Sequence, residues 1–244
     1  MPYYSYSSPF YADTIYWILL IPVLILSVYA QAKVSGNFNR YSQVRNRRQV
    51  TGAQAAYEVL KAHGIFDVGI QPCRGSLTDH YDPRTNTIYL SEPVYNSATV
   101  AAVGVAAHEA GHALQHKKRY APLWLRMALV PVCNIGSQLA MPLFFIGLIF
   151  AYTAPLMGEW LMFLGIAAYS LAVVFQLVTL PVEFNASRRA MRCLASSGTM
   201  SDEELRGSRR VLSAAAMTYV AALAVGLLSI LRLVLIAGSH SRRR

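Results

Sequence analysis

Two histidines and a glutamate in the segment HEAGH, residues 108–112, have the types and the spacing for metal chemistry. On an α-helix, residues four apart share one face, so the imidazoles of His108 and His112 can reach a single ion. Histidine nitrogens are common zinc ligands, and a carboxylate beside the first histidine can take a proton from an activated water. The pattern predicts a zinc-dependent hydrolase in which His108 and His112 bind the metal and Glu109 is the base.

A catalytic zinc ion needs a third protein ligand beside the position left open for water. His116 is a poor candidate, because eight helical residues beyond His108 correspond to a rise of about 12 Å. Glu183 is a better one, since a carboxylate at the end of a long apolar stretch needs a partner. From the residues alone, Glu183 is either the third ligand or the partner of Arg188 or Arg189.

The composition indicates a membrane protein, because 55% of the residues are hydrophobic and only 14% are charged. A bilayer-spanning helix needs about 20 mostly apolar residues. Four stretches meet this requirement: residues 12–32, 123–150, 160–180 and 212–237. The expected fold class is therefore a mainly α membrane protein with about four transmembrane helices.

The net charge of +10 is explained by membrane topology and does not indicate a nucleic acid partner. Basic residues crowd the segments after the first and third stretches, whereas residues 1–11 and 153–159 contain neither lysine nor arginine. The positive-inside bias then predicts a multi-pass membrane protein, with both long loops and the active site on the cytoplasmic side. Arg232, inside the last stretch, and the arginines at 242–244 fit this topology least well.

The expected domain organisation alternates membrane and cytoplasmic segments. It comprises an N-terminal tail (1–11), a first span (12–32), a cytoplasmic α+β segment with the HExxH helix (33–122), a pair of spans (123–180), a cytoplasmic helix with the third ligand (181–211), a fourth span (212–237) and a basic tail (238–244).

The segment 33–122 is expected to form a small zincin-like insertion. Thr51 and Gln54 have the spacing of a capping box, and Gly64 can end the helix that this box begins. Asp82 opens a turn sequence that should join two strands. The remaining expected elements are strands near 68–71 and 87–90 and a helix over 97–116 that carries the motif.

Four runs, at residues 77–83, 105–115, 179–190 and 211–220, resemble the YugP-type neutral zinc metallopeptidases of bacteria. More distantly, the order of HExxH, apolar stretches and the run EFNASRRA at 183–190 is similar to the HtpX and CAAX-prenyl protease group. That resemblance implies that Glu183 is the third zinc ligand, as in gluzincin-like enzymes. It also places Ser187 where the group has an aspartate that hydrogen-bonds to the zinc-bound groups, so the partner there is left open, with Asn185 as one candidate.

Two further residues could assist catalysis. If the strand at 88–90 lay at a sheet edge and held a peptide by strand pairing, His80 or Tyr81 could stabilise the developing oxyanion. The alternative is that this region is a turn held by aspartate side chains. Tyr219 is another possible oxyanion donor, although packing in its helix explains a tyrosine there equally well.

With the family resemblance, these observations predict one zinc ion and an endopeptidase of the bacterial inner membrane, embedded in the lipid bilayer, that hydrolyses peptide bonds of membrane or membrane-proximal proteins. The main alternative is a non-proteolytic zinc-binding membrane scaffold or quality-control factor. A structural zinc site needs four ligands and no base, so Glu109 argues against it. A transporter would have more ionisable residues inside its spans. The three cysteines form no close pair, and nothing in the sequence indicates an oligomeric state.

Overall fold

The structure is a computed structural model that describes the backbone of residues 9–241 and the side chains of residues 16–238. Residues 1–8 of the expected N-terminal tail and residues 242–244 of the expected basic tail lie outside the described part. The chain divides into two compact units. The first comprises Met1–Val28, Arg126–Val178 and Tyr219–Arg244, and the second comprises Tyr29–Leu125 and Thr179–Thr218.

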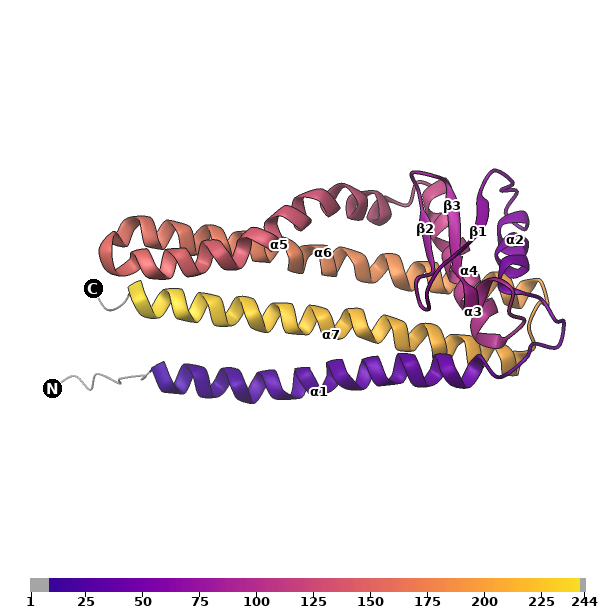
Figure 1. Cartoon of the computed structure of the whole chain (residues 1–244), viewed down its shortest axis with the longest axis horizontal. Coiled ribbons are helices and arrows are strands. Elements are labelled where there is room, and N and C mark those ends of the chain that lie inside the picture. The colour runs from indigo at the N-terminus through magenta and orange to yellow at the C-terminus, as the bar shows by residue number, and fades with distance from the viewer. Residues whose placement is uncertain (1–8, 242–244) are drawn as a thin grey trace. The chain divides into compact units, whose positions relative to one another are not determined.

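Long helices form the described part of the first unit (Figure 1). They are segments of α1 (Pro9–Tyr41), α5 (Ala121–Thr153), α6 (Pro155–Ser196) and α7 (Asp202–Ser241). Among the described residues these four helices are long and apolar enough to cross a membrane, which confirms the predicted fold class. Each helix continues beyond its apolar stretch. The helix of the third stretch, α6, runs without a break into the segment that contains Glu183.

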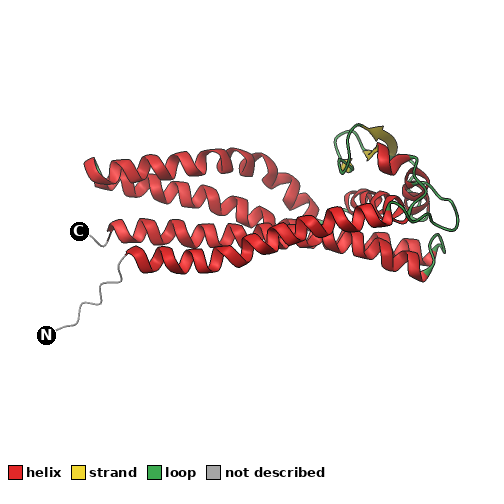
Figure 2. Ribbon diagram, turned by 60° about the horizontal axis from the view of Figure 1, so that its bottom comes forward, coloured by secondary structure: helices red, strands yellow, loops and turns green. Residues whose placement is uncertain are grey.

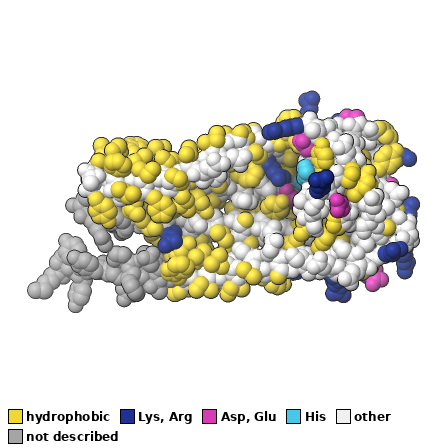
Figure 3. Space-filling view, viewed as in Figure 1, with side chains coloured by type: hydrophobic (Ala, Val, Ile, Leu, Met, Phe, Trp, Pro, Cys, Tyr) yellow, Lys and Arg dark blue, Asp and Glu magenta, His cyan; other side chains and the backbone are white. Residues whose placement is uncertain are grey.

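The surface of the first unit is that of a membrane protein. Large apolar side chains such as Ile25, Ile135 and Ile149 are exposed, and hydrophobic side chains cover the face of this unit seen in Figure 3. The Arg232 guanidinium lies over the Tyr16 ring, 4.5 Å from its centroid, and this cation-π contact gives the intramembrane charge a partner.

The second unit contains a small sheet, whose strands are yellow in Figure 2, and the motif helix, labelled α4 in Figure 1. Its strands are β1 (Gly69–Cys73), β2 (His80–Asp82) and β3 (Thr87–Ser91), and its helices are α2 (Gly52–Lys61), α3 (Glu92–Tyr95) and α4 (Val100–Lys117). The ends of the four long helices complete it. The sheet order is β1-β3-β2, with β1 parallel and β2 antiparallel to β3.

The predicted edge position of the strand at 88–90 is wrong, because β3 is the middle strand of the sheet. It pairs with β1 along one edge and with β2 along the other. Its Ile88 and Leu90 side chains are fully buried, whereas residues of β2 are partly or fully exposed. Peptide pairing at this sheet would therefore have to use β2 or β1.

Local sequence signals begin and end the helices of this unit as expected. The Thr51 hydroxyl accepts a hydrogen bond from the Gln54 backbone, and the Gln54 side chain accepts one from the Thr51 backbone, which confirms the capping box. Gly64 has a φ of 71°, the left-handed conformation that glycine adopts freely at a helix end. The motif helix begins after Thr99, whose hydroxyl accepts from the backbone of Ala102.

The motif helix α4 lies at the centre of the second unit because most of its side chains are small. The alanines at 101, 102, 106, 107, 110 and 113 are all buried. On one side, a Cβ built at Gly104 would lie 2.9 Å from the Ser208 side chain of α7. The Ser208 hydroxyl in turn donates to the Val100 carbonyl at 2.8 Å. Neighbouring elements can thus approach α4 closely and hold its histidines in place.

Candidate metal centre

Three possible ligand atoms converge between α4 and α6. The Nε2 atom of His108 lies 3.2 Å from the Glu183 Oε2 atom and 3.2 Å from the Nε2 atom of His112. The His112 Nε2 atom lies 3.6 Å from the same Glu183 oxygen. The two histidines of the motif and Glu183, which lies 71 positions after His112, therefore form one triangle of possible ligand atoms.

The size of this triangle fits zinc. Nitrogen and oxygen ligands lie about 2.0 to 2.2 Å from zinc, so two ligands of a tetrahedral site are about 3.3 to 3.6 Å apart. The three measured distances of 3.2, 3.2 and 3.6 Å agree with that geometry. Three protein ligands also leave a fourth tetrahedral position, which is the arrangement of a catalytic site and not of a structural one.

A glycine within the motif allows the two ligand-bearing helices to meet. A Cβ atom built at Gly111 would lie 2.6 Å from the Ala186 carbonyl oxygen of α6. Any side chain at position 111 would therefore push α6 away from α4. Since Glu183 lies less than one helical turn before Ala186, this close contact brings its carboxylate within reach of both histidines.

Ser187 is the hydrogen-bond partner of His108. The Ser187 hydroxyl oxygen lies 3.0 Å from the His108 Nδ1 atom. When Nε2 binds a metal ion, Nδ1 carries the proton and its N–H donates a hydrogen bond to the Ser187 oxygen, which fixes the ring orientation. The Ser187 hydroxyl makes a neutral hydrogen bond where a carboxylate would make a charged one.

Gln115 is the corresponding partner of His112, and the sequence analysis missed it. Its Oε1 atom accepts from the His112 Nδ1 atom at 3.0 Å, while its Nε2 atom donates to the Val182 carbonyl at 2.7 Å and to the Asn185 Oδ1 atom at 3.1 Å. The Asn185 oxygen also accepts from Arg189 at 2.6 Å. These bonds to α6 orient the fully buried Gln115 amide and thereby the imidazole. A polar residue one helical turn after His112 was the available signal.

Glu109 is buried beside the ligands, with 8% of its surface exposed. Burial raises the pKa of its carboxyl to about 7, with the Glu183 charge adding to the rise and His108 opposing it. A carboxyl with a pKa near neutral can both accept and release a proton, as the predicted base must do. This environment supports the role assigned to Glu109 from the motif.

His116 does not join the ligand triangle. Its Nδ1 atom lies 2.9 Å from the Tyr81 hydroxyl, which also donates to the Asn86 side chain at 2.9 Å. The His116 ring packs against Trp124 as well, at 5.4 Å between centroids. His116 and Tyr81 therefore attach the turn between β2 and β3 to the end of α4.

The remaining candidates have different positions. Asp79 accepts from the backbone and hydroxyl of Ser91, and Asp82 accepts from the Arg84 backbone, so aspartates do hold the region around β2. His80 is exposed on β2 with its ring stacked on Tyr89, and its charge lowers the pKa of Glu109. Tyr219 belongs to the first compact unit, and its catalytic role stays a prediction.

A His-His-Glu triangle of zinc dimensions, in a chain with four helices of membrane-spanning length and composition, defines the class of membrane metalloproteins. Comparison with known proteins gives the family. The chain belongs to the family described as "Putative neutral zinc metallopeptidase", whose model matches residues 16–238. The predicted resemblance is therefore confirmed, and the family agrees with zinc as the cofactor.

A relative in Bacillus subtilis (strain 168) supports the same assignment. The chain is 48% identical over 218 residues to "Putative membrane protease YugP", and the match covers 89% of this chain and 94% of the relative. No solved structure matches the chain. The protein is thus a membrane member of a zinc peptidase family, with peptides as its class of substrate.

Proposed function

We propose that this protein is a gluzincin-like zinc endopeptidase of the bacterial inner membrane, which cleaves membrane or membrane-proximal proteins on the cytoplasmic side. In this proposal His108, His112 and Glu183 hold the zinc ion, and Glu109 is the general base. The observation that carries it is the triangle of ligand atoms, with edges of 3.2 to 3.6 Å, beside a buried glutamate with a raised pKa.

The proposed reaction is hydrolysis of a peptide bond by water. A zinc ion held by the three ligands would act as a Lewis acid toward the attacking water and the scissile carbonyl. Glu109 accepts a proton from the water as its oxygen bonds to the carbonyl carbon, and then delivers that proton to the nitrogen of the departing amine. Ser187 and Gln115 keep the two imidazoles oriented during these steps.

The preference for membrane-proximal substrates is supported by continuity of the chain. Glu183 follows the predicted span at 160–180 by three residues, about 4.5 Å along one unbroken helix. The basic residues that follow this span favour a cytoplasmic position for the same segment. A peptide that reaches Glu109 would therefore leave or approach the bilayer nearby.

The test uses Glu109→Gln in the full-length protein, purified in detergent and loaded with zinc. We expect a zinc content equal to that of the unaltered protein and cleavage of unfolded casein reduced by about 100-fold or more, because the base is lost and the ligands remain. Glu203→Gln changes an exposed glutamate of α7 and serves as the matched control, with unchanged cleavage.

The same experiment separates the proposal from a non-proteolytic zinc scaffold. Undiminished casein cleavage by the Glu109→Gln variant, together with undiminished cleavage by the unaltered protein after a chelator has removed its zinc, would contradict the proposed chemistry. Absence of any cleavage by the zinc-loaded protein, across unfolded and membrane-protein substrates, would favour the scaffold.

A further inference from the structure

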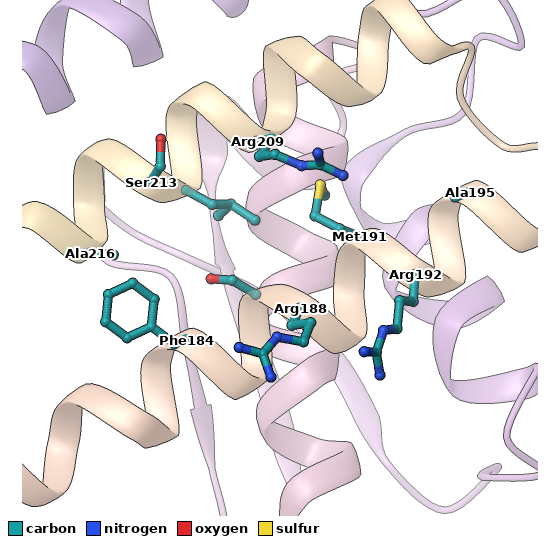
Figure 4. Close-up of a pocket in the computed structure, with 10 residues that line it drawn as sticks. Phe184, Arg188, Met191, Arg192, Ala195, Arg209, Ser213 and Ala216 are labelled. Atoms are coloured by element: carbon teal, nitrogen blue, oxygen red, sulfur yellow. The ribbon is translucent and has the colours of Figure 1, made fainter.

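A groove of about 400 Å³ lies between α6 and α7 within the second unit (Figure 4). Its surface is mostly apolar, with Phe184 and Met191 contributed by α6 and Leu212 and Ala216 by α7. The only charged residues that line it are arginines: Arg188, Arg192 and Arg209. Phe184 comes directly after a proposed zinc ligand, but the groove has no acidic or histidine lining and is not part of the metal triangle.

The three arginines lack partners within the described residues. No ion pair, side-chain hydrogen bond or ring contact of the described chain involves their guanidinium groups, and all three side chains belong to exposed residues. Neighbouring arginines differ, since Arg189 donates to Asn185 and Arg210 donates to the Tyr41 hydroxyl. Three like charges around one groove repel one another unless an anion is present.

The groove is apolar at one end and basic at the other, as binding of an amphipathic ligand requires. Along α6, the order Phe184, Arg188, Arg192 leads away from the predicted span at 160–180, over about 12 Å of helix. Along α7, Arg209 comes first and Ala216 comes later, at the beginning of the apolar stretch. Figure 4 shows Phe184 and Ala216 together at one end of the groove and the arginines toward the other.

We infer that this groove binds an anionic phospholipid, with the phosphate of its headgroup at the arginines and an acyl chain along the apolar end. Basic pockets between membrane helices bind anionic headgroups in this way, and each arginine near the membrane surface adds to the attraction. A zwitterionic lipid carries its own cation and gains less from three arginines. A peptide that bound here would need an acidic group and an apolar tail as close together as they are in a phospholipid.

The test measures lipid binding directly and does not depend on peptidase activity, so it stands apart from the proposed function. Native mass spectrometry of the full-length protein in detergent follows the binding of dioleoyl phosphatidylglycerol and of dioleoyl phosphatidylcholine. We expect phosphatidylglycerol to bind about tenfold more tightly. The variant with Arg188→Gln, Arg192→Gln and Arg209→Gln should weaken that binding by about tenfold or more and leave phosphatidylcholine unchanged.

A matched control removes three exposed arginines that do not line the groove: Arg45→Gln, Arg48→Gln and Arg206→Gln. It lowers the net charge equally and should keep phosphatidylglycerol binding within about twofold of the unaltered protein. Circular dichroism verifies that both variants are folded. Equal binding of the two lipids, or an equal loss in the control, would overturn the inference. So would displacement of the lipid by glycerol 3-phosphate at a similar concentration, because the headgroup alone would then account for binding.

Discussion

The hydroxyl of Ser187 lies 3.0 Å from the Nδ1 atom of His108, on the side of the imidazole opposite the ligand triangle. This contact joins α6 to α4 a second time, one helical turn beyond Glu183. A hydroxyl can accept a hydrogen bond from the imidazole N–H without adding a negative charge, so it orients His108 but polarises the ring less than a carboxylate would. The metal affinity of the site should therefore respond to the residue at position 187.

Removal of the Ser187 hydroxyl should weaken metal binding. We expect Ser187→Ala to lower zinc affinity by about tenfold to 100-fold, as loss of such a partner does in other zinc sites. Ser187→Asp should keep or increase the affinity, since a carboxylate accepts the same proton more strongly. Competition with a chromophoric chelator measures both, and Ser213→Ala provides a control on α7. An affinity unchanged in Ser187→Ala would show that the hydroxyl does not orient His108.

Replacement of Gln115 should reduce both stability and metal affinity. Gln115→Leu removes one acceptor and two donors from a fully buried site, and the Val182 carbonyl loses its partner. We expect a destabilisation of about 1 to 3 kcal/mol and a zinc affinity lower by about tenfold to 100-fold. Thermal unfolding of the zinc-free protein separates the first effect from the second. Gln71→Leu, on an exposed position of β1, should change neither quantity.

A single methyl group at position 111 should separate the ligand-bearing helices. The Cβ of Gly111→Ala would meet the Ala186 carbonyl at 2.6 Å, so α6 has to move and carry Glu183 with it. We expect a loss of about 1 to 3 kcal/mol in stability, typical of overpacking, together with impaired zinc binding. Gly36→Ala is the control, because a Cβ there meets nothing within 4 Å and alanine favours the helix by about 0.5 to 1 kcal/mol. A fully stable, zinc-binding Gly111→Ala protein would contradict the proposed close packing.

The proposed third ligand is tested by metal content. Glu183→Ala should leave two histidines, which cannot hold zinc through dialysis against a weak chelator, whereas the unaltered protein should retain about one ion per chain. Glu203→Ala is the matched control for loss of one carboxylate. Atomic absorption of the dialysed proteins gives the result. Equal zinc in Glu183→Ala and in the control would show that another residue completes the site.

Much of the fold could be predicted from local sequence. Long apolar stretches predicted the four membrane helices, and the Thr51 capping box, Gly64 and the turn at Asp82 predicted the boundaries of short elements. These signals act between residues close in the chain, so they are visible in sequence. The position of β3 was mispredicted because strand order depends on which distant segments pair. Pairing with β1 along one edge and with β2 along the other placed that strand in the middle.

The sequence by itself determined the pair of histidines and the adjacent glutamate, because helical periodicity alone places His108 and His112 on one face. The place of Glu183 at the end of an apolar stretch made it a candidate, and the family resemblance favoured it as the third ligand. The tertiary structure decided what the helices do together: Gly111 lets Ala186 approach, the Glu183 carboxylate reaches both imidazoles, and Ser187 and Gln115 orient them. Apart from the Gln115–His112 bond within α4, these contacts join residues about 70 to 80 positions apart, and hydrogen-bond geometry over that separation is fixed by packing and not by local chain preference.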